Sequence, residues 1–279
     1  MSDNWVISNI ENAFNVWNDK MAELWGLVTQ SPETFKGGTI WSVIENINGG
    51  LQAIGYGLLV LFFAMSIFKS TASFRDFQRP EYALKHFIRF IAAKLAVSEA
   101  LTIMTTLFGI CGGIVQQVTA SMGGMSGAMV SLPSAISDAI DNVGFWAGIP
   151  LWLVTILGSL FITVMSFIMI MTVYGRFFKL YMYTALAPVP LASFAGEGTS
   201  SFGKAFIKSY IGVCMEGAVI VLSCLIFSAF VSSNSPAFDT SVTVVTMVWS
   251  YLGEVIFNML VLVGLIKASD RIVKEMFGT

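Results

Sequence analysis

Residues 177–196 read FFKLYMYTALAPVPLASFAG, and this stretch determines how many times the chain crosses a membrane. It is apolar enough to enter a bilayer, yet Pro188 and Pro190 each remove a backbone hydrogen-bond donor that an unbroken spanning helix needs. Broken backbone at membrane depth persists only where protein covers it or where it lines a cavity. The stretch therefore predicts either a re-entrant or interfacial segment, or a kinked sixth crossing.

The composition of the whole chain is that of a membrane protein. Its 279 residues are 56% hydrophobic and 11% charged, and the mean hydropathy is +0.77, whereas soluble domains carry about 25% charged residues. Charged stretches separate apolar runs that reach the roughly 20 residues a spanning helix needs. The expected fold is an all-α polytopic membrane protein with five spans, at residues 51–68, 87–111, 149–173, 205–230 and 242–266.

The distribution of basic residues favours the re-entrant interpretation of residues 177–196. If that segment returns on one side, the basic loop 69–85, Lys179, Lys204 and Lys274 all face the same side, which the positive-inside rule makes cytoplasmic. A sixth crossing would instead place the basic tail opposite the basic loop. We therefore expect a bacterial cytoplasmic-membrane protein with its N-terminus outside and its C-terminus in the cytoplasm, with the kinked helix as the open alternative.

Residues 1–48 are expected to form an extracytoplasmic region ahead of a transmembrane domain at 49–275. Apolar residues recur there at alternating spacings of three and four, which predicts an amphipathic helix. Its polar face is acidic rather than lysine-rich, which favours packing against other copies or a partner over packing on lipid. Tryptophans near the N-terminus keep the lipid interpretation open. The expected oligomer interface consists of Ile10, Phe14, Trp17, Met21 and Leu24.

The outer loop between the second and third spans, residues 112–148, contains one helical pattern. Residues 131–143 read SLPSAISDAIDNV, in which either Ser131 or Ser134 can open a short helix. The rest of the loop is rich in glycine and other small residues, which permit close approach of the backbone. We expect one short helix within an otherwise irregular connection.

Ionisable and polar residues inside the expected spans are candidates for function, because such residues are costly in a bilayer. They occur along helical faces of the second, fourth and last spans. One interpretation is that they line a wetted pathway. The other is that they hydrogen-bond the helices together, with Lys94 neutralising a carboxylate. The candidates are Lys94, Glu99, Lys208, Glu216, Glu254 and Asn258.

No pattern in the chain points to catalysis, a metal or a cofactor. The cysteines Cys111, Cys214 and Cys224 form no CxxC pair, and His86 is the only histidine. The GxxxxGK[ST] phosphate-binding motif of ATPases is also absent. We therefore expect a protein that is not an enzyme, with no catalytic or metal-binding residues and no cofactor.

A family resemblance is carried by RFFKLYMYTALAPVPLASFAG at 176–196, followed by SFGKAFIKSYIGVCMEGAVIVL at 201–222. Together with the five-span pattern, these stretches resemble the TrbL-like channel subunit of bacterial type IV secretion and conjugation machines, in the form found in Gram-positive mobile elements. The resemblance implies a homo-oligomeric ring in membrane lipid, with secretion ATPases and other secretion subunits as partners. It also implies transient contact with translocated single-stranded DNA or protein, and it supplies no catalytic residues.

Three functions fit these sequence features. The first is a channel subunit that helps to move a DNA–protein substrate across the cytoplasmic membrane. The second is a small-molecule or proton-coupled transporter, because such proteins place broken helices beside buried carboxylates. The third is a membrane scaffold that conducts nothing. The absence of an inverted repeat and the odd number of spans count against the transporter.

Overall fold

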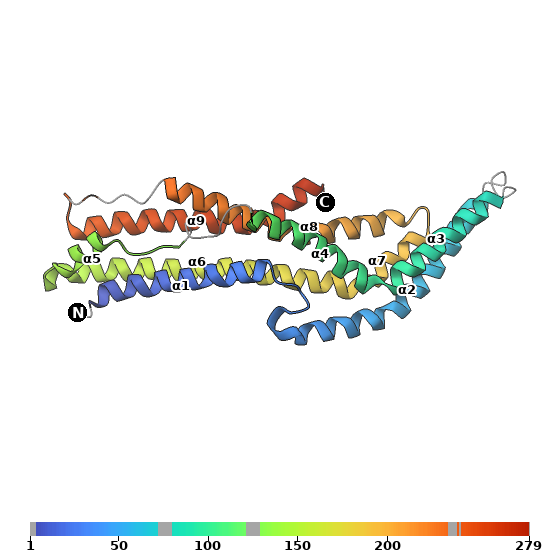
Figure 1. Ribbon diagram of the computed structural model, residues 1–279, viewed down its shortest axis with the longest axis horizontal. Coiled ribbons are helices and arrows are strands. Elements are labelled where there is room, and N and C mark those ends of the chain that lie inside the picture. Colours follow the sequence, from blue (N-terminus) through green and yellow to red (C-terminus); the bar gives the residue numbers. More distant parts are fainter. Residues whose placement is uncertain (1–3, 72–79, 121–128, 234–238, 240, 279) are drawn as a thin grey trace. The chain divides into compact units, whose positions relative to one another are not determined.

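The computed structural model describes residues 4–71, 80–120, 129–233, 239 and 241–278, and every regular element in those residues is a helix (Figure 1). This confirms the all-α fold. The α-helices are α1 (Trp5–Val28), α2 (Thr39–Thr71), α3 (Pro80–Ser98), α4 (Ala100–Ala120), α5 (Ser134–Asp141), α6 (Phe145–Leu186), α7 (Pro188–Leu191), α8 (Ser200–Ser233) and α9 (Val244–Phe277). Two short 3-10 helices are η1 (Phe35–Gly38) and η3 (Ala192–Ala195).

Five helical stretches within the described residues are long and apolar enough to cross a membrane. Each exceeds the roughly 20 residues that a bilayer core requires. The number agrees with the number of spans expected from the sequence, and the chain is a multi-pass membrane protein by length and composition of its helices. The stretches are Phe35–Lys69, Ala100–Ala120, Gly148–Leu186, Ser200–Ser233 and Val244–Phe277.

The second span lies further along the chain than residues 87–111, where the sequence placed it. The apolar helix is α4, and it extends through residues 112–120, which had been assigned to the outer loop. Residues 87–98 instead belong to α3, which also carries Lys85, Arg89 and Lys94 and is too charged for a spanning window. Backbone hydrogen bonds from Glu99 N to Leu95 O and from Ile103 N to Glu99 O link the two helices, so the chain bends at Glu99 without losing its helical ladder.

The outer loop is correspondingly shorter than expected. The short helix predicted there is α5, which begins at Ser134, and α6 already begins at Phe145. Residues 121–128 of this loop lie outside the described part of the chain.

The chain divides into two compact units, and α4, α6, α8 and α9 contribute residues to both. Unit 1 is drawn from residues 1–29, 115–174 and 218–269. Unit 2 is drawn from residues 30–114, 175–217 and 270–279. Residues 30–48 therefore group with α2, and the division expected between residues 48 and 49 is not the boundary of a compact unit.

In unit 1, α1 lies along the first part of α6 (Figure 1). The rings of Trp5 and Trp152 are 5.4 Å apart at one end of this pair. At the other end the Tyr174 hydroxyl donates a hydrogen bond to the Glu23 carboxylate. Asn18 fixes the connection before α5, because its side chain donates to Val130 O at 2.9 Å and accepts from Val130 N at 3.0 Å.

The apolar face of α1 is buried within the same chain. This confirms the amphipathic pattern but removes the reason for assigning the face to an oligomer interface, because unit 1 already covers it. A second copy is not needed to shield these side chains from water or lipid. All five residues assigned to that interface have at most 2% of their surface exposed: Ile10, Phe14, Trp17, Met21 and Leu24.

Candidate functional site

The proline segment of unit 2, residues 187–195, begins where α6 ends at Leu186 (Figure 1). Helix α6 would continue through a hydrogen bond from residue 188 to Thr184 O, but Pro188 has no N–H group. The side-chain amide of Asn48 on α2 donates to that carbonyl instead, at 2.7 Å, and Asn48 is 2% exposed. Helix α6 therefore ends before Pro188, Pro190 lies within the short helix α7, and a side chain from another helix compensates for the missing backbone donor.

Two glycines allow the proline segment to pack closely on α2. A Cβ atom on Gly55 would lie 2.9 Å from Pro188 O and 3.0 Å from Val97 Cγ1. A Cβ atom on Gly196 would lie 3.0 Å from Phe62 O. Any larger residue at Gly55 would push backbone against backbone, so the contact between α2 and α7 depends on glycine there. Small side chains complete the packing, since Ala187, Ala192 and Ala195 are fully buried.

The proline segment follows α2 and does not turn back along it. At its start Thr184 accepts from Asn48, and at its end Glu197 N donates to Ser66 Oγ at 3.3 Å. Asn48 and Ser66 are 18 positions apart on one helix, which is about 27 Å at a rise of about 1.5 Å per residue. The re-entrant interpretation, in which residues 177–196 return to the side from which they came, is therefore wrong. The segment continues in the direction of α6 and adds no sixth crossing, because five stretches of the described residues are long and apolar enough to span.

The expected topology also needs a correction at the start of α2. It placed residues near Lys36 outside the membrane and Arg176 and Lys179 in the cytoplasm. The Phe35 and Phe177 rings stack with centroids 4.1 Å apart, and the Tyr181 hydroxyl donates to Pro32 O at 2.8 Å. The two stretches lie side by side, so a bilayer core of about 30 Å cannot separate them.

Charged residues from three long helices meet in unit 2. The Lys179 ammonium on α6 contacts Glu216 on α8 at 3.0 Å and Asp270 on α9 at 2.7 Å. Lys274 contacts Asp270 at 2.9 Å. Glu216 is almost fully buried, whereas Lys179 and Asp270 are about one-third exposed. We call these four residues the inner network, which ties α6, α8 and α9 together through ion pairs.

Arg176 lies fully buried on α6, one helical turn before Lys179. Its guanidinium donates to Val213 O at 3.3 Å and to Cys214 O at 3.1 Å. Its carbon lies 5.7 Å from the centre of the Phe108 ring, within cation–π range. A Cβ atom on Gly217 would lie 2.8 Å from this guanidinium, so glycine at that position makes room for it.

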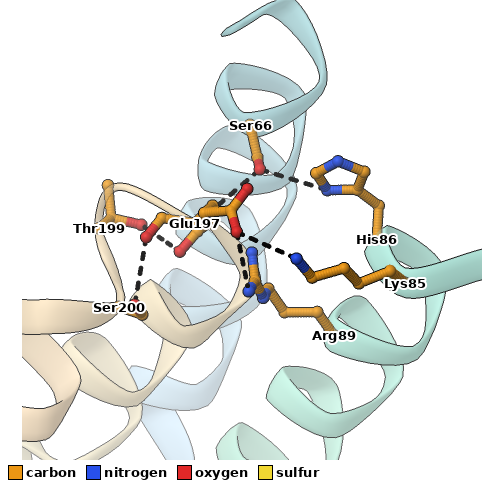
Figure 2. Close-up of polar contacts among 8 residues, drawn as sticks. Ser66, Lys85, His86, Arg89, Glu197, Thr199 and Ser200 are labelled. Carbon is orange, nitrogen blue, oxygen red and sulfur yellow. Dashed lines mark hydrogen bonds and ion pairs between the residues drawn. The ribbon is translucent and has the colours of Figure 1, made fainter. Parts of the chain in front are cut away.

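A second polar cluster lies where α2, α3 and the turn before α8 meet (Figure 2). Glu197 in the turn contacts the Lys85 ammonium at 3.4 Å and the Arg89 guanidinium at 3.5 Å. His86 is buried, and its Nδ1 lies 3.5 Å from Ser66 Oγ. Burial raises the pKa of Glu197, but the positive charges of Arg89 and Lys85 outweigh it and hold the pKa of this carboxyl below its usual range. We call Lys85, Arg89 and Glu197, with Lys69, the terminal cluster.

Of the six polar residues predicted inside the spans, only Glu216 joins the inner network. It pairs with Lys179, which also contacts Asp270, and Lys94, which was considered as a cation for one of the carboxylates, is not part of the network. Lys94 is exposed on α3, Glu99 is exposed and accepts from Thr102 Oγ1 at 3.1 Å, and Lys208 contacts Gly278 O at 3.5 Å. In unit 1, Glu254 is exposed and Asn258 is buried on α9.

Sequence reasoning missed several residues that organise unit 2. Lys179 was used only to predict the topology, and Asp270 was not considered. Both residues border apolar runs, and their charges are opposite. Asn48 gave a weaker signal, as one polar residue among several before an apolar helix. Glu197 was the best available signal, because a single acidic residue in the turn after the prolines stands among many basic ones.

The described residues contain no group of three or more His, Cys, Asp or Glu side chains that could hold a metal ion. The three cysteines are free thiols and are buried. The charged clusters described above can pair helices or bind ions of opposite charge.

The long apolar helices define a polytopic, all-helical membrane protein. A family model described as TrbL/VirB6 plasmid conjugal transfer like protein matches residues 17–188. This range covers more than half of the chain and includes α2, α3, α4 and α6, so the chain belongs to the TrbL/VirB6-like family. No curated protein and no solved structure matches the chain.

Proposed function

We propose that the chain is a channel or scaffold subunit of a type IV secretion machine for conjugative DNA transfer. It would help to move single-stranded DNA with its attached protein across the cytoplasmic membrane. Membership of the TrbL/VirB6-like family carries the proposal, because that family is described by plasmid conjugal transfer. The chain would have no catalytic role, and secretion ATPases would supply the energy.

The packing of unit 2 supports a conduit formed between chains. Where the proline segment meets α2 and α3, the core is filled by side chains that are fully buried, among them Val97, Ala187 and Ala192. A DNA strand passing there would have to break the ion pairs and the Asn48 hydrogen bond. We therefore infer that several copies, or this chain with other secretion subunits, surround the path as a ring.

The orientation that we propose keeps the N-terminus outside and the C-terminus in the cytoplasm. Lys69, Lys85 and Lys204 lie at or near the end of α2 where the terminal cluster sits, and this end would face the cytoplasm. The positive charge of Lys179 does not count against this orientation under the positive-inside rule, because Glu216 and Asp270 neutralise it. Single cysteines at Glu33 and Lys204, in a chain without native cysteines, should react with an impermeant reagent from outside and from inside, respectively.

The experiment that tests the function is deletion of the gene in donor cells, followed by complementation. Deletion should abolish DNA transfer, and the wild-type chain should restore it. A complementing variant with Arg271→Gln, which alters an exposed i,i+4 ion pair with Glu275, is the control and should transfer normally. Normal transfer by the deletion strain would rule out the proposed function.

The inner network is the one feature that favours a proton-coupled transporter as a second candidate. A buried carboxylate beside a lysine is an arrangement that such proteins use to bind and release protons. The purified chain in liposomes would then move protons down an imposed gradient, and Glu216→Gln would stop that movement. A channel subunit that uses Glu216 only to hold helices together predicts no proton movement in either form.

A further inference from the structure

Helix α3 presents an apolar face that the rest of unit 2 does not cover. Its opposite face packs inward through His86, Ala93 and Val97, which are at most 8% exposed. The spacing of the outward residues follows the helical repeat, so they form one continuous stripe. Their exposed fractions range from 43% to 60%, and they are Leu84, Phe87, Ile88, Ile91 and Leu95. Phe68 near the end of α2 is 76% exposed.

The basic residues of the terminal cluster stand at the border between the apolar stripe and the packed face. Lys85 and Arg89 are one turn apart, and at about 100° per residue both follow the stripe on the same flank. Lys69 belongs to the same cluster, because a Cβ atom on Gly198 would lie 3.4 Å from its ammonium. Apolar side chains flanked by lysine and arginine are typical of helices in contact with a membrane interface.

The terminal cluster has more hydrogen-bond donors than acceptors. Among the described residues, Lys85 and Arg89 pair with one carboxylate, that of Glu197, and the Lys69 ammonium lies beside the neighbouring Gly198. Both ion pairs are long, at 3.4 Å and 3.5 Å, compared with about 2.7–2.9 Å for strong charge-assisted hydrogen bonds. The Arg89 Nη1 group is buried and has no hydrogen-bond partner among the described residues. The cluster can therefore accept a second anion, which would share these donors with Glu197.

We propose that the terminal cluster binds the phosphate head group of an anionic phospholipid, whose acyl chains lie along the apolar stripe of α3. Lys85 and Arg89 hold the phosphate, Lys69 adds a third charge, and Glu197 weakens the site by competing for the same donors. The chain would thus carry a lipid-binding site, and this proposal does not depend on whether the chain transports DNA.

The apolar stripe favours a lipid over the other sources of phosphate. A DNA strand also carries phosphates, but it would leave Leu84, Phe87 and Ile88 uncovered, whereas acyl chains cover them. A free phosphate ion would use the charges alone. Basic residues at the end of an apolar helix pair are a recognised setting for anionic head groups.

The test is a titration of the full-length purified chain, in an uncharged detergent, with tail-labelled phosphatidylglycerol and, separately, phosphatidylcholine with the same tails. The wild type should bind phosphatidylglycerol more tightly. Lys85→Gln and Arg89→Gln should each weaken that affinity about fivefold, and the double variant about 25-fold. Arg271→Gln, which removes one exposed charge from α9, is the matched control and should bind as the wild type does.

Glu197→Gln separates a binding role from a structural one. If Glu197 competes with the lipid phosphate, its neutralisation should tighten phosphatidylglycerol binding. If its ion pairs only hold the turn on α3, the variant should bind equally or more weakly, which would overturn the proposal. The phosphatidylglycerol affinity of Glu197→Gln still tests the proposal if the double variant Lys85→Gln with Arg89→Gln fails to fold.

Competition identifies the source of the phosphate. Glycerol 3-phosphate and a single-stranded oligonucleotide should each fail to displace phosphatidylglycerol at concentrations where unlabelled phosphatidylglycerol succeeds. Displacement by glycerol 3-phosphate would make this a site for soluble phosphates, and displacement by the oligonucleotide would make it a nucleic-acid site. Either result, or equal binding of the two lipids, would contradict the proposal.

Discussion

The side chain of Asn48 donates a hydrogen bond to the carbonyl oxygen of Thr184, which Pro188 leaves without its helical partner. Residues 136 positions apart in sequence are thereby joined at the point where the longest helix ends. The bond explains how an apolar chain with two closely spaced prolines remains packed inside the protein. It also fixes the level on α2 at which the proline segment begins.

Asn48→Leu should destabilise the protein, because it removes the 2.7 Å hydrogen bond and leaves the Thr184 carbonyl with only the longer bond from Ala187 N, at 3.4 Å. The expected loss is about 0.5–1.5 kcal/mol, the usual net contribution of one hydrogen bond, measured as a lower midpoint of thermal unfolding in detergent. Ser42→Ala, on the exposed part of the same helix, is the control and should have little effect. An unchanged midpoint for Asn48→Leu would show that the hydrogen bond does not hold the segment.

Gly55 and Gly57 form a matched pair for testing the contact between α2 and α7. Gly55→Ala places a methyl group 2.9 Å from Pro188 O, so the segment must shift, and unfolding should occur at a lower temperature. A Cβ atom on Gly57 meets nothing within 4 Å. Gly57→Ala should therefore be neutral or stabilising by up to about 1 kcal/mol, because alanine favours the helix. Equal effects of the two changes would argue against close packing at Gly55.

The inner network predicts that two changes together do less harm than one. Lys179→Gln leaves Glu216 buried beside Asp270 without its cation, and loss of a buried partner costs up to about 3–5 kcal/mol. Lys179 is partly exposed, so we expect the lower end of that range. The double variant Lys179→Gln with Glu216→Gln should recover part of the loss in thermal unfolding. Strictly additive losses would mean that the two side chains do not interact.

The contribution of Glu197 should depend on pH. Its pKa is lower in the folded chain than in the unfolded chain, so its ion pairs stabilise the fold above the unfolded pKa, which is about 4.3. That stabilisation is lost as the pH falls through the folded pKa. The side chain is 58% exposed, so the effect is small. The difference in unfolding midpoint between wild type and Glu197→Gln should shrink from neutral pH to about pH 3, and a difference that grows on acidification would contradict it.

Local sequence patterns predicted the elements of this fold well. Spacings of three and four predicted α1, a serine beside apolar residues predicted the start of α5, and prolines predicted the end of α6. In each case the cause lies within a few residues, as a side-chain repeat or a missing backbone donor. The break between α3 and α4 was missed because the backbone hydrogen bonds continue through Glu99 and only the charges before it hint at the change.

Contacts between distant residues could not be predicted in the same way. Lys179 meets Glu216 across 37 positions and Asp270 across 91, and helix packing alone selects these partners. The sequence offered Lys94 as a cation for one of the buried carboxylates, without fixing which one, because helix packing is not visible in it. The burial of Trp17 within its own chain was not predicted for the same reason. An amphipathic stripe does not show whether the same chain or another copy will bury the apolar face.

Contact with the transferred DNA tests the proposed function most directly. Donor cells carrying an epitope-tagged chain would be crosslinked during conjugation, and the transferred strand would be measured in the immunoprecipitate. We predict that the strand is recovered with the tagged chain, and that recovery disappears when the secretion ATPases are inactivated. Efficient DNA transfer with no recovery of the strand, in crosslinked cells where another secretion subunit does recover it, would contradict a place for this chain on the DNA path.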